Sequence, residues 1–366
     1  MKKIYCCPLP FLAACFLLLY ALAVFLAQSP WRDISFVPHP SGVRAVSLGD
    51  AGGALEADGM YFFSAAHSLN CWDGRSVRTL ILPGSFGGKY YHLENGVLFY
   101  LDMRRQYGLF AYELSSGRTE RLVDFSSFPE FPARDDDVAH SAFWWADGER
   151  YYFLAQKAGT AAYAIWQTDG EGNFLSREYI PSEVRRVTHM VGEELVCMTK
   201  RYMPDGSEEN GDIGLYNPYT GGWRTLLWFE ASDVSYGEPI GVWEGELLVP
   251  RSDGVYLALD PQTGETEIFA QLDDPSLRLV SADGSAVYAI QNGATLGLYR
   301  DGAFTPIGLA DEFDCQAGDV LFVSGRADET FTGAAVIDLT GRPDFDGVSQ
   351  YAVLPDGTVY RLYAAS

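Results

Sequence analysis

A polar residue beside glycine, followed at once by an apolar strand-like run, recurs along most of this chain. These turns are Asp58-Gly59, Asn95-Gly96, Asp147-Gly148, Gly192-Glu193, Glu244-Gly245, Asp283-Gly284, Gly318-Asp319 and Asp356-Gly357. Consecutive glycines of the series are 34 to 53 residues apart. Glycine supplies the positive φ that a tight hairpin needs, and strand-rich repeats of roughly 40–50 residues are typical of propeller blades. The pattern predicts an all-β fold, a β-propeller.

A second turn recurs between these marks and supports the same fold. It appears as Ser116-Gly117, Thr220-Gly221, Thr263-Gly264 and Thr340-Gly341, each after a strand-like run. Most units then read as four antiparallel strands joined by short turns, which is the make-up of one blade. No 3.6-residue periodicity is sustained after the N-terminal region, so helices are not expected there.

Residues 257–266 resemble one repeat of the quinoprotein-type propellers. The wider pattern over residues 40–363 resembles generic TolB-like and quinoprotein-like bacterial propellers. The resemblance implies a fold and no activity, because each matching motif is only a hairpin signal. Residues 281–284 begin like a sialidase-type Asp-box, but the rest of its spacing does not follow, and no cofactor is expected.

The number of blades is seven or eight, with seven favoured. If residues 348–354 form an outer strand of the preceding blade, the count is seven. If the candidate strands at 34–37 and 43–48 complete a separate last blade, the count is eight. The rival architecture is a pair of β-sandwiches in tandem, which the even repeat and the absence of a Pro/Ser-rich linker disfavour.

One apolar segment at the N-terminus predicts a membrane anchor. Residues 4–27 carry no charge and follow Lys2 and Lys3; spanning a bilayer takes roughly 20 apolar residues. The lysines favour a cytoplasmic N-terminus. We therefore expect a cytoplasmic stub and signal anchor at 1–27, a stalk at 28–42 and an extracytoplasmic propeller at 43–366. The alternatives are a cleaved signal peptide, since Ala21-Leu22-Ala23 fits the small-x-small cleavage pattern, and lipidation of Cys15 in a lipobox-like stretch.

Charge and cysteine content narrow the partners. The chain has 49 Asp and Glu residues against 26 Lys and Arg residues, a formal net charge of −23, so nucleic acid is not an expected partner. Cys71, Cys197 and Cys315 are more than a hundred residues apart and lack metal-binding spacing. We expect buried free thiols rather than a disulfide framework or a zinc site.

Three histidines fall in runs expected to form the innermost strands: His92, His140 and His189. Their unequal distances from the following glycine place them at different heights along their strands. No H-x-H or H-E-x-x-H pattern occurs. Ordinary hydrogen-bonded histidines are expected rather than a metal site.

Two long acidic loops are the places where binding is expected, because loops on a rigid scaffold often carry function. The first spans 125–139 and the second includes Gly206 and Gly211. Neither has the spacing of an EF-hand calcium loop. Tryptophans can stack on sugars or peptides or can pack in the core, and one or two exposed tryptophans are expected. The candidate binding residues are Asp135, Asp136, Asp137, His140, Trp144, Trp145, Asp205, Glu208, Glu209 and Asp212.

The sequence favours a binding or scaffold module over an enzyme. It contains no G-x-S-x-G elbow and no phosphate-cradling glycine loop that opens a helix. We expect a membrane-anchored propeller that binds an envelope protein, a peptide or a glycan. The alternative is an enzyme that acts on a carbohydrate or small molecule at the mouth of the channel, and a third hypothesis is a structural envelope component.

Overall fold

The computed structural model describes residues 54–65, 68–81, 88–103, 105–132, 142–157, 160, 162–202, 205, 208–229, 234–309, 312–326, 335–336, 348–356 and 358–363. Within these ranges the regular structure consists of strands β1 to β29 and a short 3-10 helix, η1 (Phe125–Ser127). Contacts divide the chain into Met1–Pro38 and His39–Ser366, and every described strand belongs to the second unit. The all-β prediction is confirmed.

The first four sheets are antiparallel four-stranded meanders, with strand orders β1-β2-β3-β4, β5-β6-β7-β8, β9-β10-β11-β12 and β13-β14-β15-β16. Their strands are β1 (Ala54–Ala57), β2 (Met60–Ala65), β3 (Ser68–Trp72), β4 (Val77–Ile81), β5 (Gly88–Glu94), β6 (Val97–Asp102), β7 (Gly108–Glu113), β8 (Thr119–Asp124), β9 (Phe143–Ala146), β10 (Arg150–Gln156), β11 (Tyr163–Asp169), β12 (Phe174–Tyr179), β13 (Val184–Val191), β14 (Glu194–Tyr202), β15 (Glu208–Tyr216) and β16 (Trp223–Leu227).

Two further sheets complete the order along the chain. In the eight-stranded sheet, the meanders β17–β20 and β21–β24 are joined by a parallel pairing of β17 with β21, and the last sheet has the order β25-β26-β28-β29-β27. Their strands are β17 (Gly241–Trp243), β18 (Glu246–Pro250), β19 (Val255–Leu259), β20 (Thr266–Gln271), β21 (Leu277–Gly284), β22 (Ala286–Gln291), β23 (Thr295–Arg300), β24 (Ala303–Leu309), β25 (Glu312–Ala317), β26 (Val320–Arg326), β27 (Ala335–Val336), β28 (Val348–Val353) and β29 (Val359–Tyr363).

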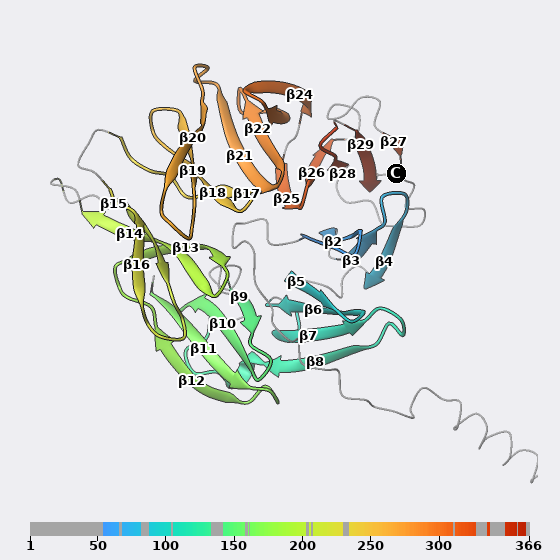
Figure 1. The fold of residues 1–366 in the computed structure, drawn as a ribbon. Coiled ribbons are helices and arrows are strands. Elements are labelled where there is room, and N and C mark those ends of the chain that lie inside the picture. The colour runs from blue at the N-terminus through green and yellow to red at the C-terminus, as the bar shows by residue number, and fades with distance from the viewer. Residues whose placement is uncertain are drawn as a thin grey trace, which may run out of the picture. The chain divides into compact units, whose positions relative to one another are not determined.

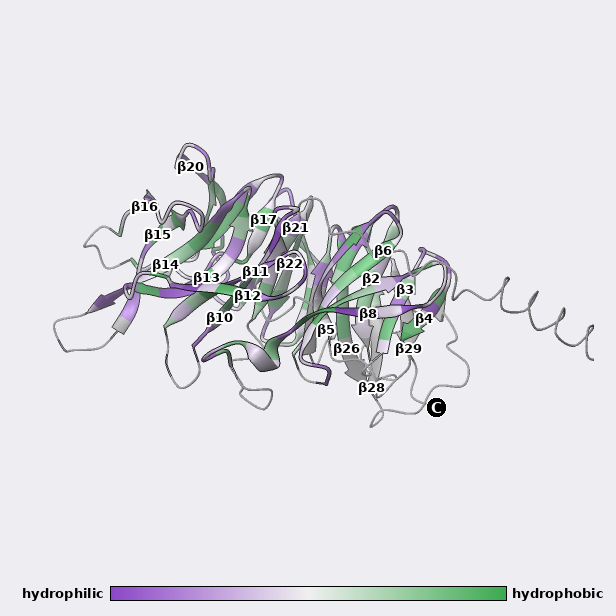
Figure 2. Ribbon diagram, turned by 90° about the horizontal axis from the view of Figure 1, so that it is seen from below, coloured by the Kyte–Doolittle hydropathy of each residue, from purple (hydrophilic) through white to green (hydrophobic). Residues whose placement is uncertain are grey.

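The sheets are arranged radially around a common centre, which is a β-propeller (Figure 1). Strand β1 contacts β5 and β25, and β21 contacts β25, so the first strands of neighbouring sheets meet near the centre. The second and third strands are the most buried; every residue of β6 and of β19 is buried, whereas β12 and β20 have several exposed residues. Hydrophilic residues gather at the ends of the hairpins (Figure 2).

The recurring polar-glycine turns occupy the hairpins that the sequence predicts. Between β1 and β2, Asp58 and Gly59 have φ angles of 54° and 70°, the positive values that a type I′ turn requires at both central positions. The second recurring turn is capped by a side chain. In the turn between β19 and β20, which contains Thr263-Gly264, the Asp260 carboxylate accepts a 2.7 Å hydrogen bond from the Gln262 N–H. A turn residue thus satisfies backbone donors where no strand partner is present.

The ring closes through side chains. The first and last sheets share a buried cluster that includes Phe63 of β2 and Phe322 of β26, whose stacked ring centroids are 4.7 Å apart. The Trp72 and Tyr360 rings, 5.3 Å apart, lie in the same contact. Among the described strands, neither of these sheets pairs with a strand of the other. Apolar packing across the seam therefore performs the closure.

Residues 348–353 join the last sheet, but not as the outer strand that the seven-blade interpretation expects, because β29 and β27 lie beyond them. They form β28, which pairs with β26 as the third strand of the last sheet, and Asp356 of the eighth turn lies between β28 and β29. The candidate strands at 34–37 and 43–48 lie outside the described residues, as do the stalk at 28–42 and the apolar segment at 4–27. In the part of the chain that is described, no helix is long and apolar enough to cross a membrane.

Candidate functional site

The first acidic loop is described only in its first half. Asp135, Asp136, Asp137 and His140 lie outside the described residues. The three phenylalanines of residues 125–132 are buried: the Phe125 and Phe131 ring centroids are 4.6 Å apart, the Phe131 ring meets Trp166 edge-on at 4.8 Å, and Phe128 packs beside them. The described start of this loop is therefore part of the aromatic core.

The two candidate tryptophans of β9 are core residues. Trp144 and Trp145 are each 1% exposed. The Trp144 indole N–H donates to the Tyr90 carbonyl at 2.8 Å, and that of Trp145 donates to the Tyr219 hydroxyl at 3.0 Å. The first bond reaches the sheet of β5 and the second reaches the β15–β16 turn. These indoles join neighbouring sheets. Their faces are not open to a ligand, although the sequence had suggested both tryptophans as candidate binding residues.

The second acidic loop is largely a β-hairpin. Glu208, Glu209 and Asp212 belong to β15, which pairs with β14, and only Asp205 lies in the connecting turn. The pairing aligns Tyr202 with Glu208 and Arg201 with Glu209. The prediction of a long irregular loop was wrong here, because the end of β14 and the start of β15 consist of polar residues that resemble a loop sequence. The run Pro204-Asp205-Gly206 carries the turn chemistry that would have indicated a hairpin.

The outer part of this hairpin, residues 200–202 and 208–210, is here called the arm. The pairing of β13 with β14 ends at Thr199, and the pairing of β16 with β15 ends at Ile213. The arm is consequently a two-stranded ribbon that reaches past its neighbours, as both views show (Figures 1 and 2). In the described ranges its one further backbone bond is from the Lys200 N–H to the Glu183 carbonyl, at 2.7 Å.

Two aromatic side chains on or beside the arm are open to solvent. Tyr202 is 67% exposed and Trp228, directly after β16, is 68% exposed. Asp212, which follows the arm on β15, holds the segment of Trp228 in place. Its carboxylate accepts a 2.7 Å hydrogen bond from the Phe229 N–H. The Arg201 guanidinium lies over the Phe229 ring, 3.8 Å from its centroid. The expectation of one or two exposed tryptophans is confirmed by Trp228.

The described histidines and thiols do not form a metal site. No group of three His, Cys, Asp or Glu side chains within the described ranges is placed to hold an ion. Cys71 and Cys197 are buried free thiols, as predicted. His92 of β5 lies 3.5 Å from a Glu94 carboxylate oxygen, and burial lowers the pKa of its imidazole.

His189 of β13 departs from the prediction that the histidines are hydrogen-bonded. Its side chain is buried, and neither ring nitrogen has a hydrogen-bond partner among the residues that the structure describes. Burial lowers the pKa of this imidazole to about 4.

Carboxylates also meet near the centre of the ring. Burial, together with the nearby charges of Asp319 and Glu56, raises the pKa of Asp283 on β21 to about 6. Asp283 accepts from the Gly318 N–H at 2.7 Å, and Asp319 accepts from the Ser285 N–H at 2.8 Å. These bonds fasten the β21–β22 turn to the β25–β26 turn. They give both aspartates a structural role. The alternative of an enzyme with its site at the mouth of the channel stays a prediction.

The comparisons with known proteins support the fold. No protein-family model and no curated protein sequence matches the chain. A puromycin-hydrolyzing peptidase of Mycobacterium tuberculosis is similar in structure, with a TM-score of 0.52 and 12% identity over 90% of this chain and 56% of the peptidase. An acylaminoacyl peptidase of Pyrococcus horikoshii (TM-score 0.47, 12% identity, 88% of this chain and 54% of that chain) and BamB of Moraxella catarrhalis (0.33, 13%, 84% and 81%) are more distant.

This chain therefore spans little more than half the length of the two peptidases. At 12% identity, the likeness to the first peptidase concerns the β-propeller fold and carries no activity to this chain.

Proposed function

We propose that this protein is a membrane-anchored, extracytoplasmic binding module that holds a protein partner through the arm. The observation that carries the proposal is the projection of residues 200–202 and 208–210 beyond the neighbouring strands, beside the exposed rings of Tyr202 and Trp228. A ribbon that projects beyond its sheet exposes side chains and backbone that a partner can contact.

The chemistry of the arm favours a partner that presents lysine or arginine side chains. Tyr202 and Trp228 offer ring faces that attract cations. Asp205 and Glu209 are acidic residues of the same hairpin, which also contains Lys200 and Arg201, and the chain as a whole has a net charge of −23. Such a field attracts a basic surface from solution and repels an acidic one.

The anchor is part of the proposal and rests on the sequence. Residues 4–27 are uncharged and follow two lysines, which supports a single pass with the N-terminus in the cytoplasm. A fused cytoplasm-active reporter at the N-terminus and a periplasm- or surface-active reporter after Ser366 test this orientation. Activity of both reporters on the same side of the membrane contradicts it.

We also propose that the ring has seven blades. The four meanders β1–β4, β5–β8, β9–β12 and β13–β16 support this count, together with the two halves of the eight-stranded sheet and the sheet of β25–β29. The buried cluster between the first and last of these supports a ring with no further blade between them.

Site-specific crosslinking in native membranes tests the binding function. A photo-crosslinking amino acid replaces Tyr202 in one variant and Ile268 of β20, which is 66% exposed, in a matched control. The proposal expects one reproducible partner with a basic surface from position 202 and none from position 268. Failure to recover a partner, or equal capture at both positions, contradicts it.

Measuring the affinity for the purified partner makes the test quantitative. Tyr202→Ser together with Trp228→Ser removes the two exposed rings and should weaken binding by at least about tenfold, since exposed aromatic residues dominate many interfaces. Ile268→Ser should leave affinity unchanged. Added salt should slow association, because the attraction between the partners is electrostatic. Unchanged affinity in the double variant overturns the role of the arm.

A further inference from the structure

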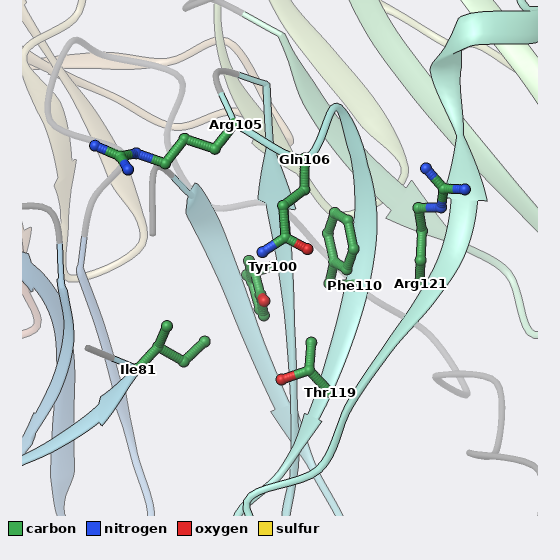
Figure 3. A pocket seen from close by; sticks show the side chains of 7 residues that line it. All are labelled: Ile81, Tyr100, Arg105, Gln106, Phe110, Thr119 and Arg121. Carbon is green, nitrogen blue, oxygen red and sulfur yellow. The ribbon is translucent and has the colours of Figure 1, made fainter. Parts of the chain in front are cut away.

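A cleft of about 590 Å³ opens on the sheet of β5–β8, where that sheet faces the end of β4. This volume lies within the roughly 300–1,000 Å³ range of sites for small ligands. Figure 3 shows its lining side chains, which come from the β6–β7 turn, from β6, β7 and β8, and from Ile81 at the end of β4. The cleft belongs to a different sheet from the arm.

The floor of the cleft is apolar and rigid. Tyr100 and Phe110 are register partners across β6 and β7, and their stacked ring centroids are 5.5 Å apart. Both side chains are buried. Burial raises the pKa of the Tyr100 phenol, so this group carries no negative charge at neutral pH. Tyr100 and Phe110 therefore form a closed base beneath the cleft and offer little surface to a ligand, and the buried Asp102 carboxylate lies near the Tyr100 phenol.

Two guanidinium groups form opposite walls. Arg121 of β8 is the register partner of Phe110, and Arg105 enters from the β6–β7 turn (Figure 3). The Arg121 guanidinium lies 2.8 Å from an Asp124 carboxylate oxygen, in an exposed pair. The Asp102 carboxylate accepts from the Arg105 backbone N–H at 2.8 Å. Among the described residues, no carboxylate lies within ion-pair distance of the Arg105 guanidinium.

The remaining polar lining is neutral. Gln106 and Thr119 contribute an amide and a hydroxyl between the two arginines (Figure 3), and none of the described lining residues is Asp or Glu. Asp124 offsets the charge of Arg121, so Arg105 is the cation of the cleft that has no ion-pair partner among the described residues.

We propose that this cleft binds a small ligand that carries a carboxylate beside an apolar or ring face. Guanidinium forks match the planar geometry of a carboxylate. The partly exposed Ile81 takes the apolar part, and Gln106 and Thr119 contribute polar groups beside it. Inorganic phosphate is the competing anion that the experiment must distinguish.

The carboxylate can come from a free organic acid or from an acidic sugar, and matched probes separate the two. Calorimetry on the purified propeller uses glucuronate against glucose and benzoate against benzyl alcohol, with inorganic phosphate as a third anion. The proposal expects binding of at least one carboxylate and none of its neutral match. Binding of glucuronate alone identifies the sugar source, and binding of benzoate alone identifies the free acid.

Substitutions place the binding in the cleft. Arg105→Gln with Arg121→Gln should weaken binding by at least about tenfold, because two charge-assisted contacts are lost. Arg118→Gln is the matched control, since Arg118 pairs with Glu120 in the same hairpin and does not line the cleft. Thr119→Trp fills the cleft without changing its charge and should abolish binding, which separates occupancy from a general charge effect.

Three results overturn the proposal. They are binding of neither carboxylate, equal binding of a carboxylate and its neutral match or of phosphate, and unchanged affinity in both the double arginine variant and Thr119→Trp. Circular dichroism of each variant ensures that a loss of binding is not a loss of folding.

Discussion

At the scale of single residues, His189 is the side chain that the fold tolerates at the greatest cost. It shares a register position with Val196, and Val196 belongs to a cluster of aliphatic residues that joins the sheet of β13–β16 to β17–β20. Two imidazole nitrogens without hydrogen-bond partners in such a place cost free energy. The same burial makes the imidazole resist protonation.

This environment predicts that His189 makes the protein sensitive to mild acid. The pKa of histidine is about 6.5 in the unfolded chain and about 4 in the fold. The free energy of unfolding therefore decreases by on the order of 3 kcal/mol as the pH falls from 6.5 to 4. Above pH 6.5 both states are neutral and the contribution is absent. His189→Leu should remove this slope and raise stability at all pH values, as measured by urea unfolding from pH 4 to pH 8.

His92→Leu is the comparison variant: burial lowers the pKa of the His92 imidazole as well, but the neighbouring Glu94 carboxylate opposes that shift, so a smaller change of slope is expected. Asp283, whose pKa is raised to about 6, titrates with the opposite sign, so only the difference between variant and parent isolates His189. Identical slopes for the parent and His189→Leu would show that the imidazole is already hydrated in the fold.

At the scale of elements, the joint between β17 and β21 depends on the absence of a side chain at one position. Gly241 has a φ of 150°, and a Cβ atom placed there would lie 1.8 Å from the Ala282 carbonyl oxygen. Gly241→Ala should therefore push β17 away from β21 and cost about 2–4 kcal/mol of unfolding free energy, as steric strain in a core does.

Gly245→Ala supplies the matched control in the next turn. Gly245 also has a positive φ, of 95°, but nothing lies within 4 Å of its Cβ position, so only backbone strain of about 1 kcal/mol is expected. Urea unfolding of both variants measures the difference. Equal losses for the two glycines would mean that the β17–β21 contact adapts without cost.

At this scale, some turns could be predicted from the sequence, whereas some strand ends could not. The turns at Asp58-Gly59 and Asn95-Gly96 could be located because glycine and a polar neighbour have a local conformational signature. The strand ends around Glu209 and Arg201 could not, since these polar runs lack the alternation of apolar and polar residues that indicates a half-buried strand. The contacts of Trp144 and Trp145 with other sheets were equally hidden, because they join residues 54 and 74 positions apart.

At the scale of the molecule, the repeat of short strands was enough to predict a ring, but not how the ring closes. The arginines of the cleft illustrate the same point. Arg105 and Arg121 are 16 positions apart in a chain with 26 basic residues, and only the register of β7 with β8 brings Arg121 to the floor formed by Tyr100 and Phe110.

Closure by side-chain packing makes a prediction about cooperative unfolding. The seam between the first and last sheets depends on contacts such as that of Phe63 with Phe322, whereas the strands inside each sheet are held by backbone hydrogen bonds. Phe322→Ala should cost about 3–5 kcal/mol and should open the ring at this seam first. Hydrogen exchange should therefore speed up in β1–β4 and β25–β29 before other sheets respond.

Leu257→Ala tests whether this behaviour belongs to the seam or to any weakened core. Leu257 lies in the aliphatic cluster between β13–β16 and β17–β20, where its loss should cost about 2–5 kcal/mol and speed up exchange in those sheets. A ring held mainly by its seam loses the end sheets first in Phe322→Ala and keeps them in Leu257→Ala. If both variants exchange uniformly, all sheets unfold as one unit, and the packing between Phe63 and Phe322 is no weaker than the other contacts between sheets.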